Sequence, residues 1–221
     1  MDLSSLISLG IFEGEGSGNF FIKDLLVQET NFTNLSLLET KFKSFKTEQG
    51  IEYKFINNDL SGKLSVPEDK ERNLSFKFDF IKINQSSTGS KDGFLSLYNS
   101  IEDEFDFSAD AIFLNGKNYG KWEFSILPEE SKLTLYDIKG VYGKWGLKNN
   151  KEGVSSLQVI KNTIGWTSKL KTNIYSGSPE KAMTQIGITP NFELDTLSLD
   201  ANLTWNNLPW LLTTIKLREK L

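Results

Sequence analysis

The side chains that could do chemistry in this chain are carboxylates, lysines and hydroxyls, because its 221 residues include no histidine and no cysteine. An acidic cluster at Glu102, Asp103, Glu104 and Asp106 is the densest group of candidate metal ligands or general acids. It lacks the glycine-punctuated spacing of a calcium loop and leads directly into a strand pattern. An exposed acidic turn that discourages edge pairing is favoured, and we expect no bound metal.

Residues 14–18, Gly-Glu-Gly-Ser-Gly, are the candidate for a phosphate-binding loop. The Gly-Lys-Ser/Thr ending is missing, and the following Phe20-Phe21-Ile22 is typical of a strand rather than a helix, so we interpret the segment as a turn. The missing imidazoles and thiols also remove Ser-His-Asp triads and Cys/His zinc sites. The chain is therefore predicted not to be an enzyme and to use no cofactor.

The composition favours a folded chain that does not bind nucleic acid. Hydrophobic residues make up 38% and charged residues 24%, which is enough apolar side chain for a core. The net charge of −4 supplies no basic field for phosphates.

The elements that would position any site are predicted to be strands, because hydrophobic and polar residues take turns at every second position. The clearest runs are residues 105–113, 121–126, 164–174 and 197–205, with shorter runs at 51–55 and 74–80. One apolar and one polar face is typical of half-buried antiparallel strands, so the sequence predicts an all-β fold. Asn115-Gly116 predicts a two-residue hairpin loop.

One short helix is expected near residues 179–186. Ser178 would be its N-cap, Pro179 its first residue and Gly187 its end, so it is long enough only for a plug or a corner. No linker composition marks a domain boundary, and we expect residues 1–221 to form one β section. The polar stretch 84–93 is the longest break and is predicted to be a flexible loop.

From Gly62 onward, a series of different short motifs follows one another along the chain. In chain order they are residues 62–67 with 74–78, the hairpin 115–122, Leu133-x-Leu135-x-x-Ile138, Gly143-Lys144-Trp145, residues 167–170, the helix ending at Ile186-Gly187, and residues 203–210, with Asn207 where glycine is usual. This series resembles the YhdP-type members of the AsmA-like family.

The resemblance implies an extended antiparallel sheet curled into an open groove, a "β-taco". It further implies non-enzymatic transport of phospholipid between the inner and outer membranes, which supports the outer-membrane permeability barrier. Because members of that family are much longer, the chain would be a fragment: a periplasmic part of a protein anchored in the inner membrane elsewhere along its length. Its partners would be phospholipid acyl chains.

If the sheet forms such a groove, the apolar phase of its strands lines it. The predicted lining residues are Phe105, Phe107, Trp122, Phe124, Ile126, Leu133, Leu135, Trp166, Leu170 and Ile174. The first ten residues lack the basic region of a signal peptide, and no window approaches the ~20 apolar residues of a membrane span. We therefore expect neither a signal peptide nor a transmembrane helix within this chain.

Three other architectures would give the same alternation of apolar and polar residues. A closed lipid-binding barrel would hold one ligand in a fixed cavity, and a β-sandwich carbohydrate-binding module would pack two sheets and stack tryptophans on sugars. In a purely structural sheet protein the apolar face would simply be core. The sequence leaves these alternatives open.

Overall fold

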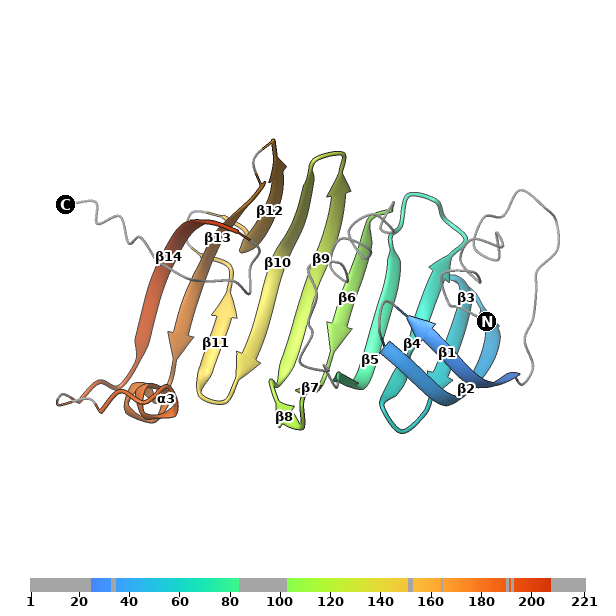
Figure 1. The fold of residues 1–221 in the computed structure, drawn as a ribbon, viewed down its shortest axis with the longest axis horizontal. Helices are drawn as coiled ribbons and strands as arrows, with labels where there is room; N and C mark the ends of the chain where they lie inside the picture. Colours follow the sequence, from blue (N-terminus) through green and yellow to red (C-terminus); the bar gives the residue numbers. More distant parts are fainter. Residues whose placement is uncertain are drawn as a thin grey trace. The chain divides into compact units, whose positions relative to one another are not determined.

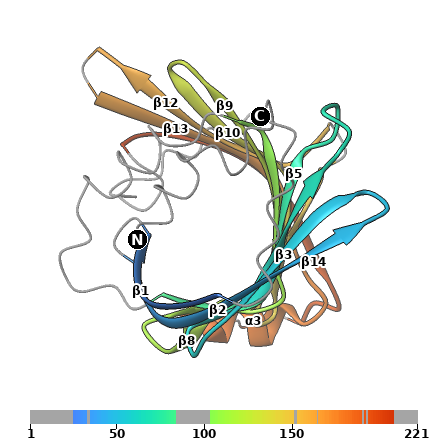
Figure 2. The ribbon, with the colours of Figure 1, turned by 90° about the vertical axis from the view of Figure 1, so that its right-hand side faces the viewer.

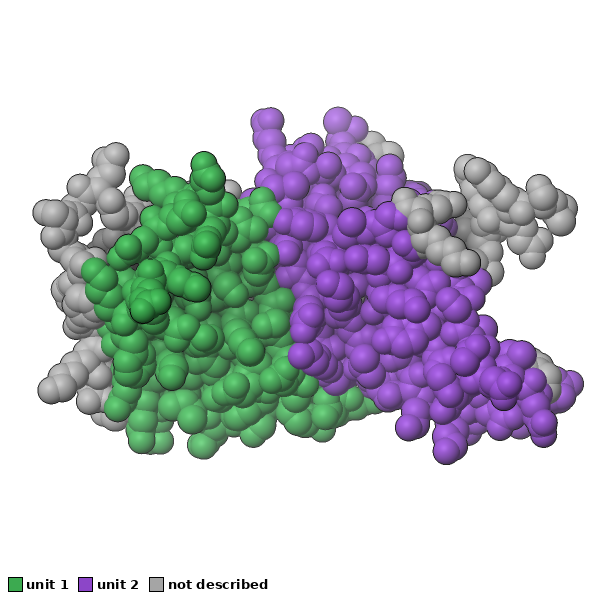
Figure 3. All heavy atoms as spheres, turned by 180° about the vertical axis from the view of Figure 1, so that it is seen from behind, with its two compact units in different colours: residues 1–118 green, residues 119–221 purple. Residues whose placement is uncertain are grey.

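The computed structural model describes residues 25–32, 35–83, 103–150, 153–163, 165–189, 191 and 193–207. The chain divides into two compact units, residues 1–118 and 119–221, coloured green and purple in Figure 3. In both units the described residues form β strands, with one short helix in unit 2, so the predicted all-β class is confirmed. The predicted loop 84–93, the glycine-rich segment 14–18 and Glu102 lie outside the described residues.

Unit 1 contains the strands β1 to β8. Their bounds are β1 Leu25–Phe32, β2 Leu35–Thr47, β3 Gly50–Ile56, β4 Leu60–Pro67, β5 Leu74–Ile83, β6 Phe105–Ala109, β7 Ile112–Leu114 and β8 Lys117–Asn118. The first five strands pair antiparallel in chain order, as consecutive alternating runs with short turns predict (Figure 1). Figure 2 shows β2 bending along its length.

The sheet of unit 1 is mixed, whereas the sequence predicted a wholly antiparallel one. Both β6 and β7 run parallel to β5. Parallel neighbours need a crossover connection of a dozen or more residues, and residues 84–104 provide that length. The long connection permits the parallel direction, which alternation within a strand cannot reveal.

The run 105–113 was predicted to be one strand, but it breaks after Ala109. Opposite the break, β5 carries a bulge at Asp79, where the register with β4 shifts. The bulge changes the phase of β5 by one residue, so Phe113 pairs with Lys82 and faces away from Phe105 and Phe107. The prediction that all three phenylalanines share one face is therefore wrong for Phe113.

The predicted hairpin loop at Asn115-Gly116 is confirmed. It joins β7 to β8, and its two residues have φ angles of 50° and 78°. Positive φ at both central positions is typical of the type I′ turn, which Asn-Gly favours because both residues tolerate the left-handed region. The strands on either side are shorter than the alternating runs predicted.

Unit 2 contains β9 to β14 and the helix. The bounds are β9 Lys121–Glu129, β10 Lys132–Tyr142, β11 Trp145–Lys148, β12 Ser156–Asn162, β13 Gly165–Ser176, α3 Pro179–Gln185 and β14 Leu197–Asn206. All pairings between these strands are antiparallel. Figure 1 shows β12 and β11 end to end between β10 and β13, so two short strands share one position in the sheet.

A bulge in β10 marks the point where its partner changes from β12 to β11. Asp137 lies there with a φ of 51°, and the register with β9 shifts between Tyr136 and Lys139. The N–H of Ile138 donates to the carbonyl of Ser155, the residue just before β12 (3.3 Å). The bulge thus keeps the backbone of β10 hydrogen-bonded where neither short strand reaches it.

The predicted helix is confirmed as α3. Pro179 occupies the first turn, as expected, but the Ser178 side chain makes no capping hydrogen bond. Instead the Ser178 N–H donates to Oγ of Ser176 (3.1 Å), and the Ser178 carbonyl accepts the first helical bond, from Ala182 (3.0 Å).

Candidate functional site

In unit 2 the register gathers the predicted lining residues onto one face of the sheet. Partners on adjacent strands share a face, and three rows cross the strands on this side. The first row is Ile126, Leu135, Leu157, Leu170 and Leu203; the second is Pro128, Leu133, Val159, Ser168 and Trp205; the third is Trp122, Gly140, Leu147, Ile174 and Leu199. Phe124 and Trp166 join them by alternation along β9 and β13. We call this side the apolar face of unit 2.

All eight lining residues predicted in unit 2 lie on this face. Leu133 and Ile126 are buried, at 4% and 9% exposure, while the other six are half-buried. The sequence-based selection missed Leu157 and Val159, which complete two of the rows. Their alternation spans only two apolar positions in a strand of seven residues, and this is too short a pattern to stand out.

Two polar side chains on the apolar face, Ser168 and Thr172, are buried and hydrogen-bonded. Ser168 and Thr172 are both 0% exposed. Ser168 Oγ donates to the carbonyl of Asn207 (2.7 Å), and Thr172 Oγ1 bonds both Ser155 Oγ (2.7 Å) and the carbonyl of Lys148 (3.3 Å). Because these hydroxyls are satisfied within the sheet, they do not interrupt the apolar character of the face.

The helix α3 is fixed at one end of unit 2 through the hairpin between β10 and β11 (Figure 1). The indole N–H of Trp145 donates to the carbonyl of Ala182 (2.9 Å), and the N–H of Lys144 donates to Oε1 of Gln185 (3.1 Å). Gly143 has a φ of 61°, and the Gln185 side chain occupies the space where a Cβ would lie. The helix therefore acts as a corner piece, one of the two roles expected for it.

Unit 1 has a corresponding face made largely of phenylalanine rings. We call it the aromatic face; it carries Phe42, Phe55, Phe76, Phe78, Phe105 and Phe107. Ring centroids along it are 6.5 Å apart for Phe42 and Phe55, 5.5 Å for Phe55 and Phe78, and 5.4 Å for Phe78 and Phe107. All six rings are half-buried. The two lining residues predicted in this unit, Phe105 and Phe107, thus belong to a longer aromatic series that the selection did not include.

A glycine on β4 allows the series to cross that strand. Gly62 lies between Phe55 and Phe78 in the register, and a Cβ there would be 3.1 Å from the Phe55 ring. With no side chain in between, the rings on β3 and β5 contact each other directly. In the next row Tyr53 and Leu64 are buried, and burial raises the pKa of the Tyr53 hydroxyl, because desolvation disfavours the phenolate.

Each unit is a single layer over its described residues. Extensive contacts between described strands of a unit are made only by neighbours in its sheet. No described strand of either unit therefore packs face to face over another strand of that unit. The apolar and aromatic faces are covered by no second sheet from the described part of their own unit.

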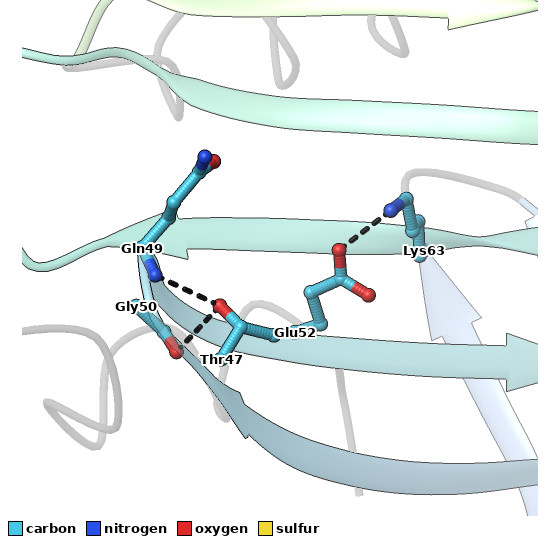
Figure 4. A network of polar contacts seen from close by, with 5 residues as sticks. All are labelled: Thr47, Gln49, Gly50, Glu52 and Lys63. Atoms are coloured by element: carbon cyan, nitrogen blue, oxygen red, sulfur yellow. Dashed lines mark hydrogen bonds and ion pairs between the residues drawn. The ribbon is translucent and has the colours of Figure 1, made fainter.

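The opposite faces are largely polar, with a few exposed apolar side chains. In unit 1, lysines from four strands stand in one row, and Glu52 forms an ion pair with one of them, Lys63 (Figure 4). The turn beside this pair is held by Thr47, whose hydroxyl donates to the Gly50 carbonyl (3.1 Å) and accepts from the Gln49 N–H (3.3 Å).

In unit 2 the polar face has a shallow hollow of about 210 Å³. Its charged lining groups are Lys121, Lys139, Lys148 and Glu123. Lys121 pairs with Glu123 (3.0 Å), and the ammonium of Lys148 lies 4.7 Å from the ring centre of Tyr175. These charges are already engaged with one another and with aromatic rings, so the hollow presents no convergent set of ligand groups.

Two features that the described residues lack concern metal binding and membrane crossing. No group of three or more acidic side chains lies close enough together to hold a metal ion among them. Within the same residues, no helix is both long and apolar enough to cross a membrane. The acidic turn ends in Glu104, whose carboxylate accepts a hydrogen bond from Asn73 (2.9 Å).

Comparison with known proteins gives no match: no protein-family profile, no curated protein and no solved structure is similar to this chain.

Proposed function

We propose that this chain binds phospholipid acyl chains along the apolar face of its sheet and carries no catalytic activity. The observation that supports the proposal is the half-buried apolar face of unit 2, formed in one layer by residues that alternate along five strand positions. Acyl chains need continuous apolar contact and no reacting group. Each methylene removed from water contributes about 0.8 kcal/mol, so a chain laid across the rows gains several kcal/mol without any specific polar contact.

The aromatic face of unit 1 supports the same use. Its six phenylalanines are half-buried, and five of their ring pairs have centroids within 6.5 Å, so the face is continuous across β2 to β6. In the transport proposal, each face contacts acyl chains within a YhdP-type AsmA-like protein. That protein would move phospholipid through the periplasm and so maintain the outer-membrane barrier.

The sandwich alternative has no observation in its favour. A carbohydrate-binding or structural sandwich needs two sheets packed face to face, with the apolar residues sealed between them. The described strands of each unit form one layer. Six of the eight lining residues predicted in unit 2 remain half-buried.

The test replaces Phe124 with aspartate. A charge on a lipid-binding face must be desolvated when a chain passes, so Phe124→Asp should abolish crosslinking to a photoactivatable phospholipid while the protein stays folded by circular dichroism. In a sealed core the same carboxylate would be buried unpaired and would unfold a marginal domain.

The matched control is Leu127→Asp. Leu127 lies on the same strand but on the opposite face and is 37% exposed. It should leave both the melting temperature and the crosslinking near wild type. A folded Phe124→Asp protein with undiminished crosslinking, or equal loss in the two variants, would count against lipid binding on the apolar face.

A further inference from the structure

A row of four lysines crosses the sheet of unit 1 on the side opposite its phenylalanine rings. Lys43, Lys54, Lys63 and Lys77 are consecutive register partners on β2, β3, β4 and β5. We call this side the lysine face. Neighbouring strands are ~4.8 Å apart, so the row places four ammonium groups within about 15 Å.

Such a row is unfavourable for folding taken alone, because like charges directly opposite each other in a sheet are destabilising. Other side chains on this face offset only part of the repulsion between the lysines. Glu52 pairs with Lys63, and the Lys54 ammonium lies 5.1 Å from the ring centre of Phe45, a contact that leaves its charge in place. Lys77 and, in the neighbouring row, Lys41 are both exposed. Neither side chain has an ion-pair or hydrogen-bond partner among the described residues.

Two exposed apolar side chains stand beside the row on the same face. Phe45 is 44% exposed and lies two residues along β2 from Lys43; Ile56 is 53% exposed and lies two residues along β3 from Lys54. A basic surface with protruding aromatic and aliphatic side chains has the composition of elements that lie at a membrane interface. There the cations meet anionic headgroups, and the apolar groups enter the boundary with the acyl chains.

We propose that the lysine face of unit 1 docks onto the surface of an anionic lipid membrane. The ammonium groups all project from one side of the sheet, so they reach a planar array of headgroup phosphates together, and Phe45 and Ile56 insert between them. The exposed apolar groups favour a lipid surface over a soluble polyanion, which offers them no apolar environment. The proposal does not rest on acyl-chain binding, because it uses the other face of the sheet.

The experiment measures flotation of the full chain with vesicles of phosphatidylcholine alone, or with about one third phosphatidylglycerol, at low and high salt. Binding should require the anionic lipid and decrease with salt. Each lysine near an anionic surface is worth about fivefold in partitioning, so the triple variant Lys43→Gln, Lys54→Gln, Lys77→Gln should bind about 100-fold more weakly. Changing Phe45 and Ile56 to serine should also weaken binding, with circular dichroism confirming the fold of each variant.

The control triple is Lys144→Gln, Lys169→Gln, Lys181→Gln, which removes the same charge from exposed positions in unit 2. It should bind close to wild type, because its charge changes lie outside the lysine face. Equal weakening by both lysine triples would overturn the proposal, as would undiminished binding to pure phosphatidylcholine. Binding to soluble polyglutamate without binding to anionic vesicles would overturn it too.

Discussion

The indole ring of Trp122 lies directly over Gly140, its register partner on the neighbouring strand. A Cβ built at residue 140 would be 2.5 Å from Cε3 of the indole and 2.7 Å from Cζ3. The indole N–H donates to the carbonyl of Tyr119 (2.7 Å), which fixes the ring in this position. A large ring covering a glycine on the adjacent strand stabilises a site that would otherwise lack side-chain packing. One of the predicted lining residues therefore also holds β9 and β10 together.

Replacing Gly140 with alanine should destabilise the protein by about 1–3 kcal/mol, because the ring must move to admit the methyl group. Urea unfolding measures the change. Gly177→Ala is the control: that position is exposed, has no atom within 4 Å of a Cβ, and should shift the free energy of unfolding by less than about 0.5 kcal/mol. Equal effects of the two substitutions would contradict the packing of Trp122 on Gly140.

In unit 1, Gly62→Ala should separate Phe55 from Phe78. The added Cβ would fall 2.5 Å from the carbonyl oxygen of Lys77 and 2.9 Å from Cα of Phe78, so β4 and β5 must shift apart. We expect a loss of about 1–3 kcal/mol in stability. Phospholipid crosslinking at the aromatic face should fall as well, because the ring series is broken at this strand. A stable variant with unchanged crosslinking would show that ring continuity across β4 is unimportant.

The hydroxyl pair of Ser155 and Thr172 should contribute measurably to stability. Thr172→Val keeps the shape of the side chain but leaves the buried Ser155 hydroxyl without this 2.7 Å partner, which costs about 1–3 kcal/mol. Thr204→Val, an exposed substitution on β14, should be nearly neutral in the same urea titration. The prediction fails if Thr172→Val is as stable as the control.

The carboxylate of Asp137, at the bulge in β10, should make the free energy of unfolding depend on pH in the acid range. Hydrogen bonding by Lys139 lowers the pKa of the Asp137 carboxyl below its ordinary 3.8, with Asn149 contributing a further hydrogen bond. A lowered folded-state pKa means that this contribution is complete above pH 3.8 and is lost as pH falls through the folded pKa. Asp137→Asn should therefore flatten the stability profile between about pH 5 and pH 2. Asparagine also tolerates the positive φ at this position, so the backbone is preserved.

The measurement is the urea midpoint of unfolding across that pH range. It compares the wild type, Asp137→Asn and a control, Asp195→Asn, at an exposed position. The control should follow the wild-type curve. At the alkaline end the same pair acts through Lys139, whose pKa Asp137 raises above 10.5, so its contribution is present below that pH and is lost as pH rises through the folded value. A profile for Asp137→Asn as steep as that of the wild type would exclude the ion pair as the cause.

Local patterns in the sequence were sufficient to predict the strands and the helix. They also predicted which side of the sheet the residues of one strand share. Trp122, Phe124 and Ile126 share a face because successive residues of a strand point to opposite sides, a property of the chain alone. The Asn115-Gly116 turn and the Pro179 helix start were equally local, since each depends on the φ preferences of one or two residues.

The tertiary structure alone decided which strands pair and where the alternation changes phase. Nothing within residues 105–113 indicates that they run parallel to β5, or that the bulge at Asp79 turns Phe113 away from Phe107, because both depend on a strand distant in sequence. The same holds for β11 and β12, which share one position between β10 and β13, with the left-handed φ of Asp137 at their junction. Alternation assigns a residue to a face, but pairing between distant segments determines which residues form a continuous surface, as with Phe55 and Phe78 across Gly62.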